Sequence, residues 1–109
     1  MKSEVLSLDV DQLRAAAGRA VAALKLLANE DRLLLLCQLS QGEACVSDLE
    51  LSLGIRQPTL SQQLGVLRNE GVVETRREGK NIYYRVADPS LLQILATLYR
   101  LYCPEGDAR

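Results

Sequence analysis

The chain has 109 residues, of which 48% are hydrophobic and 25% are charged, a length that fits one domain over residues 1–109. It contains no histidine, which excludes His-based catalytic triads and zinc sites that need imidazole. No apolar run reaches the roughly 20 residues that span a bilayer, and residues 1–11 lack the order of a signal peptide. We therefore expect a soluble, cytoplasmic protein that is not an enzyme, binds no cofactor and has no membrane partner.

The formal net charge of -1 conceals an uneven distribution. Residues 1–55 carry 5 basic and 8 acidic side chains, a net of -3, and residues 86–109 carry 2 and 3, a net of -1. Residues 56–85 carry 6 basic and 3 acidic side chains, a net of +3. A basic segment in a nearly neutral chain predicts an anionic partner that binds at one place.

Apolar residues at steps of three and four predict two helices in the first part of the chain. The first covers residues 9–28, with Asp9 as its N-cap and Gln12 three residues later. The second begins after Asn29 and ends near Gln41. Because it is apolar on nearly all sides, we expect it to lie at the centre of the fold.

Two shorter helices follow, separated by a tight connection. Ser47 and Glu50 have the spacing of a capping box for the third helix, which ends at Gly54. Pro58 stands where a first-turn proline is tolerated, and the fourth helix ends at Gly71. Its apolar face is formed by Leu60, Leu64 and Leu67.

After the fourth helix the hydrophobic period changes from 3.6 to 2. Residues 72–77 and 82–86 are predicted to be strands around a hairpin turn at 78–81. A capping residue and a first-turn proline then begin a last helix over residues 88–103. Its apolar surface is too wide for packing on one side only, which indicates contact with a second chain.

This order of elements predicts a mainly α fold with a two-stranded hairpin, the winged helix-turn-helix, with a reading head at 46–71 and a wing at 72–87. The fourth helix can enter the DNA major groove, and the basic hairpin can contact phosphate. A polar helix face or a basic hairpin alone is ordinary solvated surface, but their succession favours DNA binding. The candidate contact residues are Gln57, Thr59, Ser61, Gln62, Gln63, Arg68, Arg76, Arg77 and Lys80.

From Leu24 to Cys103 the sequence resembles the ArsR/SmtB family of bacterial repressors. The segments that carry the resemblance are Leu27-Ala28-Asn29-Glu30-Asp31-Arg32-Leu33, Val46-Ser47-Asp48-Leu49, Gln57-Pro58-Thr59-Leu60-Ser61-Gln62-Gln63-Leu64 and Leu67-Arg68-Asn69-Glu70-Gly71-Val72-Val73. Gln63 departs from the histidine usual in the family, a change that concerns the operator sequence and not the docking mode. The resemblance implies a homodimer held by the helices at 9–28 and 88–103. It also implies a repressor that leaves a palindromic operator on a chemical signal.

The three cysteines point to the nature of that signal. Arsenic-sensing members of the family have two close cysteines at the start of the third helix, whereas here Cys45 is followed by Ser47. One thiolate does not hold a soft metal that needs several sulfur ligands, so we expect no metal site there. Cys37, in Leu-Cys-Gln-Leu, and Cys103, in Tyr-Cys-Pro, instead resemble the BigR/SqrR branch, which senses reactive sulfur species. By that resemblance, a persulfide donor would join the two thiols through a polysulfide bridge.

Other interpretations of the cysteines remain open. Cys37 has the surroundings of a core residue, and the negative end of a helix dipole disfavours a thiolate at Cys103, although Arg100 is near enough in sequence to offset this. The alternatives are an arsenic- or cadmium-type metalloregulator using all three thiols, and a redox repressor forming a direct disulfide. A direct disulfide requires Cα atoms about 4.4–6.8 Å apart. Cys45 is interpreted as a bystander. A thiol enzyme is disfavoured, since no CxxC motif or nucleophile–base pair is present.

Overall fold

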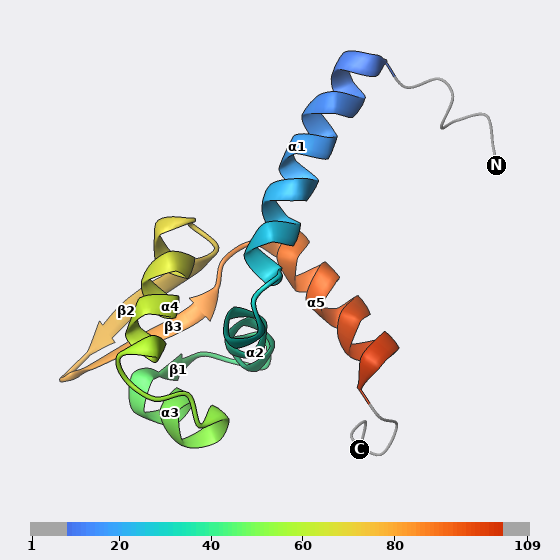
Figure 1. Cartoon of the computed structure of the whole chain (residues 1–109). Coiled ribbons are helices and arrows are strands. Elements are labelled where there is room, and N and C mark those ends of the chain that lie inside the picture. The colour runs from blue at the N-terminus through green and yellow to red at the C-terminus, as the bar shows by residue number, and fades with distance from the viewer. Residues whose placement is uncertain (1–8, 104–109) are drawn as a thin grey trace.

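The computed structural model describes residues 9–103. Residues 1–8 of the segment compared with signal peptides, and Pro104 of the Tyr-Cys-Pro ending, lie outside the described residues. The elements follow the predicted order, with one added strand (Figure 1). They are α1 (Val10–Leu27), α2 (Glu30–Leu39), β1 (Ala44–Cys45), α3 (Val46–Leu53), α4 (Thr59–Asn69), β2 (Val73–Glu78), β3 (Asn81–Val86) and α5 (Pro89–Tyr102).

Helix α2 lies at the centre of the fold, as its apolar sequence predicts. Leu35, Leu36 and Leu39 are buried, and α2 contacts all four other helices and β3. Burial of each such side chain stabilises the fold by about 1.5–3 kcal/mol. Leu60, Leu64 and Leu67 of α4 pack into the same core. Helix α4, the helix predicted to enter the major groove and called the reading helix below, is therefore held directly against α2.

Two helix starts differ from the sequence prediction. The capping box of α3 joins Cys45 and Asp48, not Ser47 and Glu50: Asp48 Oδ2 accepts a hydrogen bond from the Cys45 N–H at 3.4 Å. The shift arises because Cys45 still belongs to a strand, so the helix begins as soon as the chain leaves the sheet. Asp9 is the N-cap of α1, but its side chain makes no capping hydrogen bond.

The predicted caps of α2 and α5 are confirmed, whereas the end of α2 and the position of Pro58 differ slightly from the prediction. Asn29 caps α2 by accepting from the Arg32 N–H at 3.0 Å, whereas α2 ends at Leu39, two residues before the expected end. Asp88 caps α5, accepting from the N–H groups of the next turn. Pro58 occupies the N-cap of α4 and not its first turn.

The sheet of the wing has a third strand, β1, which lies outside residues 72–87 and which the sequence does not predict. The sheet is antiparallel with the order β1-β3-β2, and Cys45 of β1 pairs with Tyr83 of β3. A strand of two residues is too short to show the alternation of apolar and polar side chains, and only its pairing with β3 defines it. The hairpin between β2 and β3 turns at Gly79, whose φ of 64° suits a residue without Cβ.

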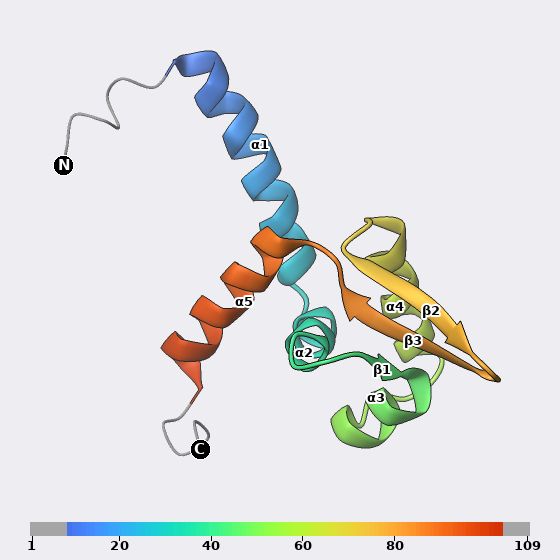
Figure 2. The same ribbon diagram turned by 180° about the vertical axis from the view of Figure 1, so that it is seen from behind.

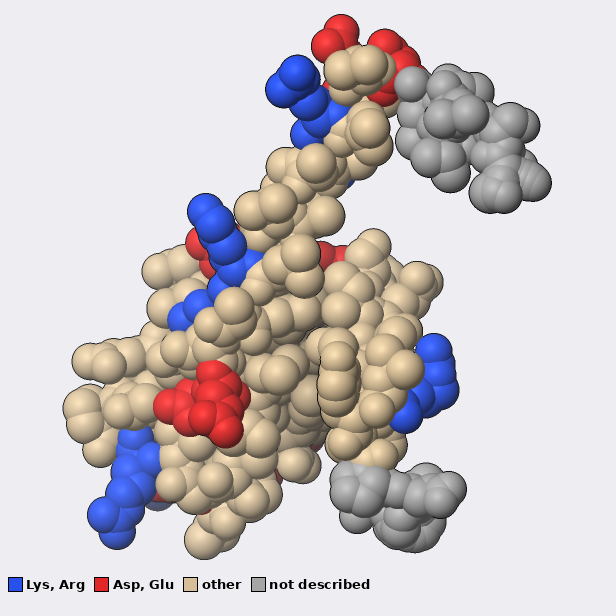
Figure 3. Space-filling model, turned by 45° about the vertical axis from the view of Figure 1, so that its right-hand side comes forward, with Lys and Arg blue, Asp and Glu red and all other residues tan. Residues whose placement is uncertain are grey.

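Helix α1 extends away from the other elements (Figures 1 and 2). Helix α5 lies on one side of α2, and α3, α4 and the sheet lie on the other side. The Cα radius of gyration is 16.4 Å, against about 12–13 Å for a compact domain of this size. On the face seen in Figure 3, charged side chains gather toward the ends of α1 and leave an uncharged stretch between them. Within residues 9–103, no helix is long and apolar enough to cross a membrane.

Candidate nucleic-acid interface and thiol pair

The predicted reading helix presents a polar face to solvent. Ser61, Gln62 and Arg68 are exposed, whereas Thr59 and Gln63 are half-buried. The opposite face is fully used by the core. The N-terminal turns of α4 therefore offer hydroxyl and amide groups of the kind that contact base edges.

Gln57 has a structural role besides the predicted one. Its Oε1 accepts a hydrogen bond from the Ser61 N–H at 3.1 Å. Pro58, at the N-cap, has no side-chain acceptor, so Gln57 satisfies an N–H in the first turn that would otherwise lack a helix partner. Its amide nitrogen is the group that remains for a further contact.

Gln63 is connected to the rest of the fold through Arg32 of α2. Arg32 Nη1 donates to Gln63 Oε1 at 3.2 Å. The same guanidinium donates to the backbone oxygens of Leu26 at 2.8 Å and Lys25 at 3.2 Å, at the end of α1. Arg32 thus joins the end of the projecting helix to the reading helix. Sequence reasoning did not single out this residue for the role.

Arg76 of the wing is engaged by other residues of the chain. Its Nε donates to Glu43 Oε1 at 2.7 Å, and its Nη1 lies 2.6 Å from Glu78 Oε1. Its guanidinium also lies over the Tyr83 ring, 4.8 Å from the centroid. These contacts fasten the segment before β1 to the hairpin. Arg76 is predicted to contact DNA, and in the structure its guanidinium pairs with Glu43, before β1, and with Glu78 in the wing.

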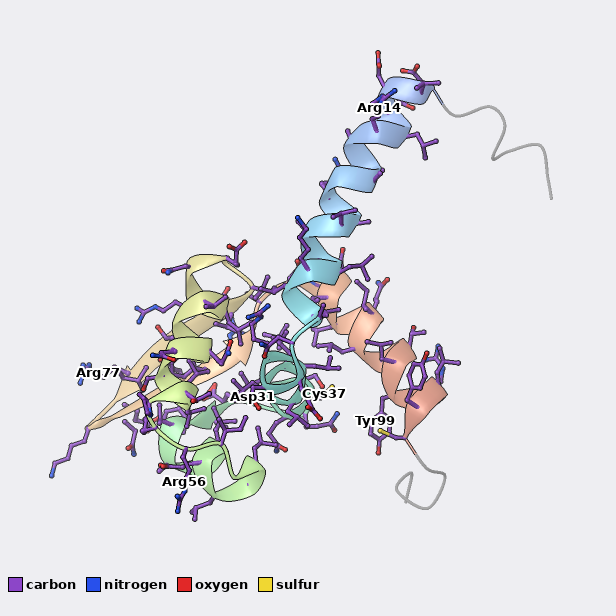
Figure 4. The ribbon with its side chains drawn as sticks, in the orientation of Figure 1. Arg14, Asp31, Cys37, Arg56, Arg77 and Tyr99 are labelled. Atoms are coloured by element: carbon purple, nitrogen blue, oxygen red, sulfur yellow. The ribbon has the colours of Figure 1, made fainter. Side chains whose placement is uncertain are left out.

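Of the other basic residues in the wing, one forms an ion pair within residues 9–103 and two do not. Arg85 pairs with Glu74 at 2.7 Å across the strands. Among the residues that the structure describes, Arg77 and Lys80 form no ion pair, and both are exposed. Figure 4 shows Arg77 at the wing and Arg56 beside the connection between α3 and α4. Sequence reasoning missed Arg56, although its position immediately before the reading helix could have identified it.

The structure places Cys37 and Cys103 on two helices that contact each other, α2 and α5, and Cys45 on strand β1. Cys37 is half-buried in α2, and Cys103 is exposed as the C-cap residue of α5. Burial raises the pKa of the Cys37 thiol, and the charge of Cys103 raises it further. Cys45 is buried between β1 and α3, with its Sγ 3.4 Å from Ser47 Oγ.

A groove of about 670 Å³ lies between α2 and α5. The α2 side of the groove is formed by Cys37, Gln38 and Gln41, and the α5 side by Leu92, Tyr99 and Arg100, with further residues of both helices. Figure 4 shows Cys37 on the side of α2 that faces α5, with Tyr99 across from it. The half-buried thiol is therefore reached from solvent through this groove.

No group of three or more His, Cys, Asp or Glu side chains that could hold a metal ion occurs within residues 9–103. Cys37 and Cys103 lie on contacting helices, and Cys45 lies apart from them in the sheet. This arrangement suits chemistry between two sulfur atoms.

Residues 29–75 match the family described as bacterial regulatory protein, arsR family. The chain is 52% identical over 87 residues to a biofilm growth-associated repressor of Agrobacterium fabrum, covering 80% of this chain and 74% of that protein. Its fold is similar to the crystal structure of the transcriptional repressor BigR from Xylella fastidiosa, with a TM-score of 0.82 and 43% identity over 90% of this chain and all of that one. Reduced HlyU from Vibrio cholerae matches with a TM-score of 0.81 and 36% identity, over 85% of this chain and 98% of that one.

These similarities confirm the fold and the family expected from the sequence. They extend over the helices and the wing, well beyond the segment matched by the family description. The chain belongs to the ArsR family of bacterial regulatory proteins, with biofilm growth-associated repressors among its relatives.

Proposed function

We propose that the protein is a homodimeric transcriptional repressor that binds a palindromic operator when reduced. It releases the operator when a reactive sulfur species joins Cys37 to Cys103. The observation that carries the proposal is a half-buried thiol on the central helix and an exposed thiol at the end of α5, the helix that packs against it. Relatives named as repressors support the regulatory part.

In this proposal the segment 46–71 reads DNA and the wing 72–87 contacts its backbone. Ser61, Gln62 and the free amide of Gln57 face the bases, while Arg56, Arg68, Arg77 and Lys80 contact phosphates. The helices around 9–28 and 88–103 form the dimer, so that two reading helices meet successive major grooves.

The sulfur step balances without an outside oxidant. Two cysteine thiols and two hydropersulfide molecules, R–S–SH, give a trisulfide bridge, two R–SH and one hydrogen sulfide. Cys103 acts first, because it is exposed whereas burial raises the pKa of Cys37. Its thiolate takes the outer sulfur of one donor, and the resulting persulfide takes a second. The Cys37 thiolate then attacks the sulfur next to that of Cys103, expelling hydrosulfide and closing the bridge.

The bridge changes DNA binding through the helices it joins. Cys103 ends α5, and Cys37 lies on the helix that packs against α4. A covalent link between them restricts how α5 and the reading helix are placed relative to each other. A coupling free energy of about 1–3 kcal/mol is sufficient for a 5–150-fold change in operator affinity.

Fluorescence anisotropy tests this switch on a palindromic duplex selected from a random pool by the reduced protein. Treatment with an organic hydropersulfide should weaken binding by wild type and Cys45→Ser about 5–150-fold. Cys37→Ser and Cys103→Ser should bind before and after treatment alike. Mass spectrometry should find one added sulfur atom bridging Cys37 and Cys103 in wild type.

The same experiment separates the alternatives. Equal release of Cys37→Ser and wild type would contradict the proposed switch. A bridge without added sulfur would assign a direct disulfide, and stoichiometric metal on the three thiols would assign a metalloregulator. Binding that does not weaken with salt would argue against a DNA-binding protein of this kind.

A further inference from the structure

The groove between α2 and α5 combines a thiol with a single positive charge. Of the residues that line it, Arg100 alone is charged. One guanidinium nitrogen of Arg100 donates to Thr97 Oγ1 at 3.4 Å. Within the part of the chain that the structure describes, Arg100 forms no ion pair. Its remaining guanidinium donors have no partner among residues 9–103, and a guanidinium fork suits a carboxylate.

The other lining groups suit a small organic molecule. Leu92, Leu95 and Tyr99 supply an apolar wall from α5, and Gln38 and Gln41 supply amides from α2. The volume of about 670 Å³ lies within the range of about 300–1,000 Å³ usual for small-ligand sites. A bare sulfide ion would use little of this space.

We propose that this groove binds a small carboxylate-bearing sulfur donor, with Arg100 pairing the carboxylate while Cys37 expels the bound arm and closes the bridge to Cys103. The inference rests on the proposed function, to which it adds the chemical class of the donor. Arg100 acts as a specificity-determining residue, since it holds the donor and takes no part in the bond changes.

The chemistry can be followed with an organic trisulfide, R–S–S–S–R. The Cys103 thiolate attacks the central sulfur, one S–S bond breaks, and R–S⁻ leaves and takes up the proton released by Cys103. The second R–S arm then lies in the groove, with its carboxylate at Arg100. The Cys37 thiolate attacks the same central sulfur and expels this arm. Two thiols and one trisulfide thus give one protein trisulfide and two R–SH.

The test compares two probes that differ in charge, the trisulfide of mercaptoacetate and its dimethyl ester. The rate of Cys37–Cys103 bridging is measured by mass spectrometry for the full-length reduced protein. The variants are Arg100→Gln, Arg100→Lys and, as a matched control, Arg14→Gln, an exposed arginine near the far end of α1 (Figure 4). Taking the ratio of the two probes for each variant cancels any change in thiolate reactivity.

We expect Arg100→Gln to lower the acid-to-ester rate ratio about two- to fivefold, as for an exposed charge pair. Arg100→Lys should recover part of the ratio, and Arg14→Gln should leave it unchanged. The preference for the acid should also fade with added salt, because the site is open to solvent.

An unchanged ratio in Arg100→Gln, or an equal loss in Arg14→Gln, would overturn the groove assignment. These results leave the proposed function standing as long as the ester bridges the two thiols and releases DNA. Failure of both probes to bridge Cys37 and Cys103 in wild type would instead overturn the proposed function itself.

Discussion

Among residues 9–103, Arg32 is the one residue whose side chain hydrogen-bonds to both the projecting helix α1 and the reading helix α4. It donates to Lys25 O and Leu26 O, which belong to the last turn of α1, and to Gln63 Oε1 in α4. Carbonyls in the last turn of a helix lack intrahelical partners, and Arg32 supplies a donor to Leu26 O. Lys25 O also accepts from the Ala28 N–H at 3.3 Å. It also orients the Gln63 amide, leaving the Nε2 group for another acceptor.

Replacement of Arg32 by methionine should lower the free energy of unfolding by about 1–3 kcal/mol, since partly buried acceptors lose their partner. It should also weaken operator binding, because Gln63 loses its fixed orientation. Urea denaturation and anisotropy measure the two effects. Arg32→Lys should be intermediate, because an ammonium cannot reproduce the fork.

Arg14→Met, on an exposed part of α1, is the control for loss of a charge. If Arg32→Met were as stable as this control, the role of Arg32 in joining α1 to α4 would be contradicted.

At the scale of elements, the wing uses most of its charge internally. Arg76 joins Glu43 to the hairpin, and Arg85 joins β3 to β2. Arg77 and Lys80 point to no carboxylate among residues 9–103. Neighbouring basic residues in the sequence therefore differ in what they can offer to DNA.

The salt dependence of operator binding should reveal this difference. Each phosphate contact contributes about 0.9 to the slope of log K against log salt concentration. Arg77→Ala and Lys80→Ala should each reduce the slope by about one per protomer, whereas Arg76→Ala should change it much less. A loss in Arg76→Ala equal to that in Arg77→Ala would show that the ion pairs open on binding.

The contact between Glu43 and Arg76 should make the wing sensitive to acid. The hydrogen bond from Arg76 lowers the pKa of Glu43 below its usual value of 4.5. A lowered carboxyl pKa stabilises the fold above the unfolded-state value, and this stabilisation is lost as the pH falls through the folded-state value. Both groups are exposed, so the effect is small.

Glu43→Gln should therefore flatten the dependence of the unfolding midpoint on pH below about 4.5. The change should be confined to that range, and the midpoint of Glu43→Gln near neutral pH should be slightly lower than that of wild type. Thermal unfolding followed by circular dichroism over a pH series measures both. If the unfolding midpoint of Glu43→Gln depended on acid pH as that of wild type does, the ion pair would not contribute to the stability of the wing.

At the scale of the whole molecule, α1 and the end of α5 expose apolar side chains that solvent alone would not favour. Leu24 is 59% exposed, and Tyr102 is 78% exposed. Such surface in helices that extend from the core is typical of an interface between chains. The proposed dimer would cover it and would set the separation of the two reading helices.

Leu13→Glu and Leu24→Glu should each raise the dimer dissociation constant about tenfold or more, because a leucine contact is lost in both protomers. Sedimentation velocity measures this. Leu51→Glu is a matched control, since Leu51 is 86% exposed on α3, away from both helices. A dimer equally weakened by Leu51→Glu would place the interface elsewhere.

Local patterns in the sequence determine much of the fold. The central helix, the caps at Asn29 and Asp88 and the hairpin at Gly79 depend on side-chain period and on backbone preferences of single residues. These act between near neighbours, so they can be recognised without knowledge of the fold. The polar face of α4 follows from the same periodicity.

Tertiary structure decided the features that depend on partners far apart in the chain. Strand β1 exists because β3 lies beside it, and that pairing moved the N-cap of α3 to Cys45. Arg76 differs from Arg77 because Glu43 reaches it across 33 positions. The packing of α5 on α2 puts Cys37 and Cys103 on neighbouring helices and forms the groove between those helices. Side-chain types specify what a residue can bind, but only packing determines which partner is within reach.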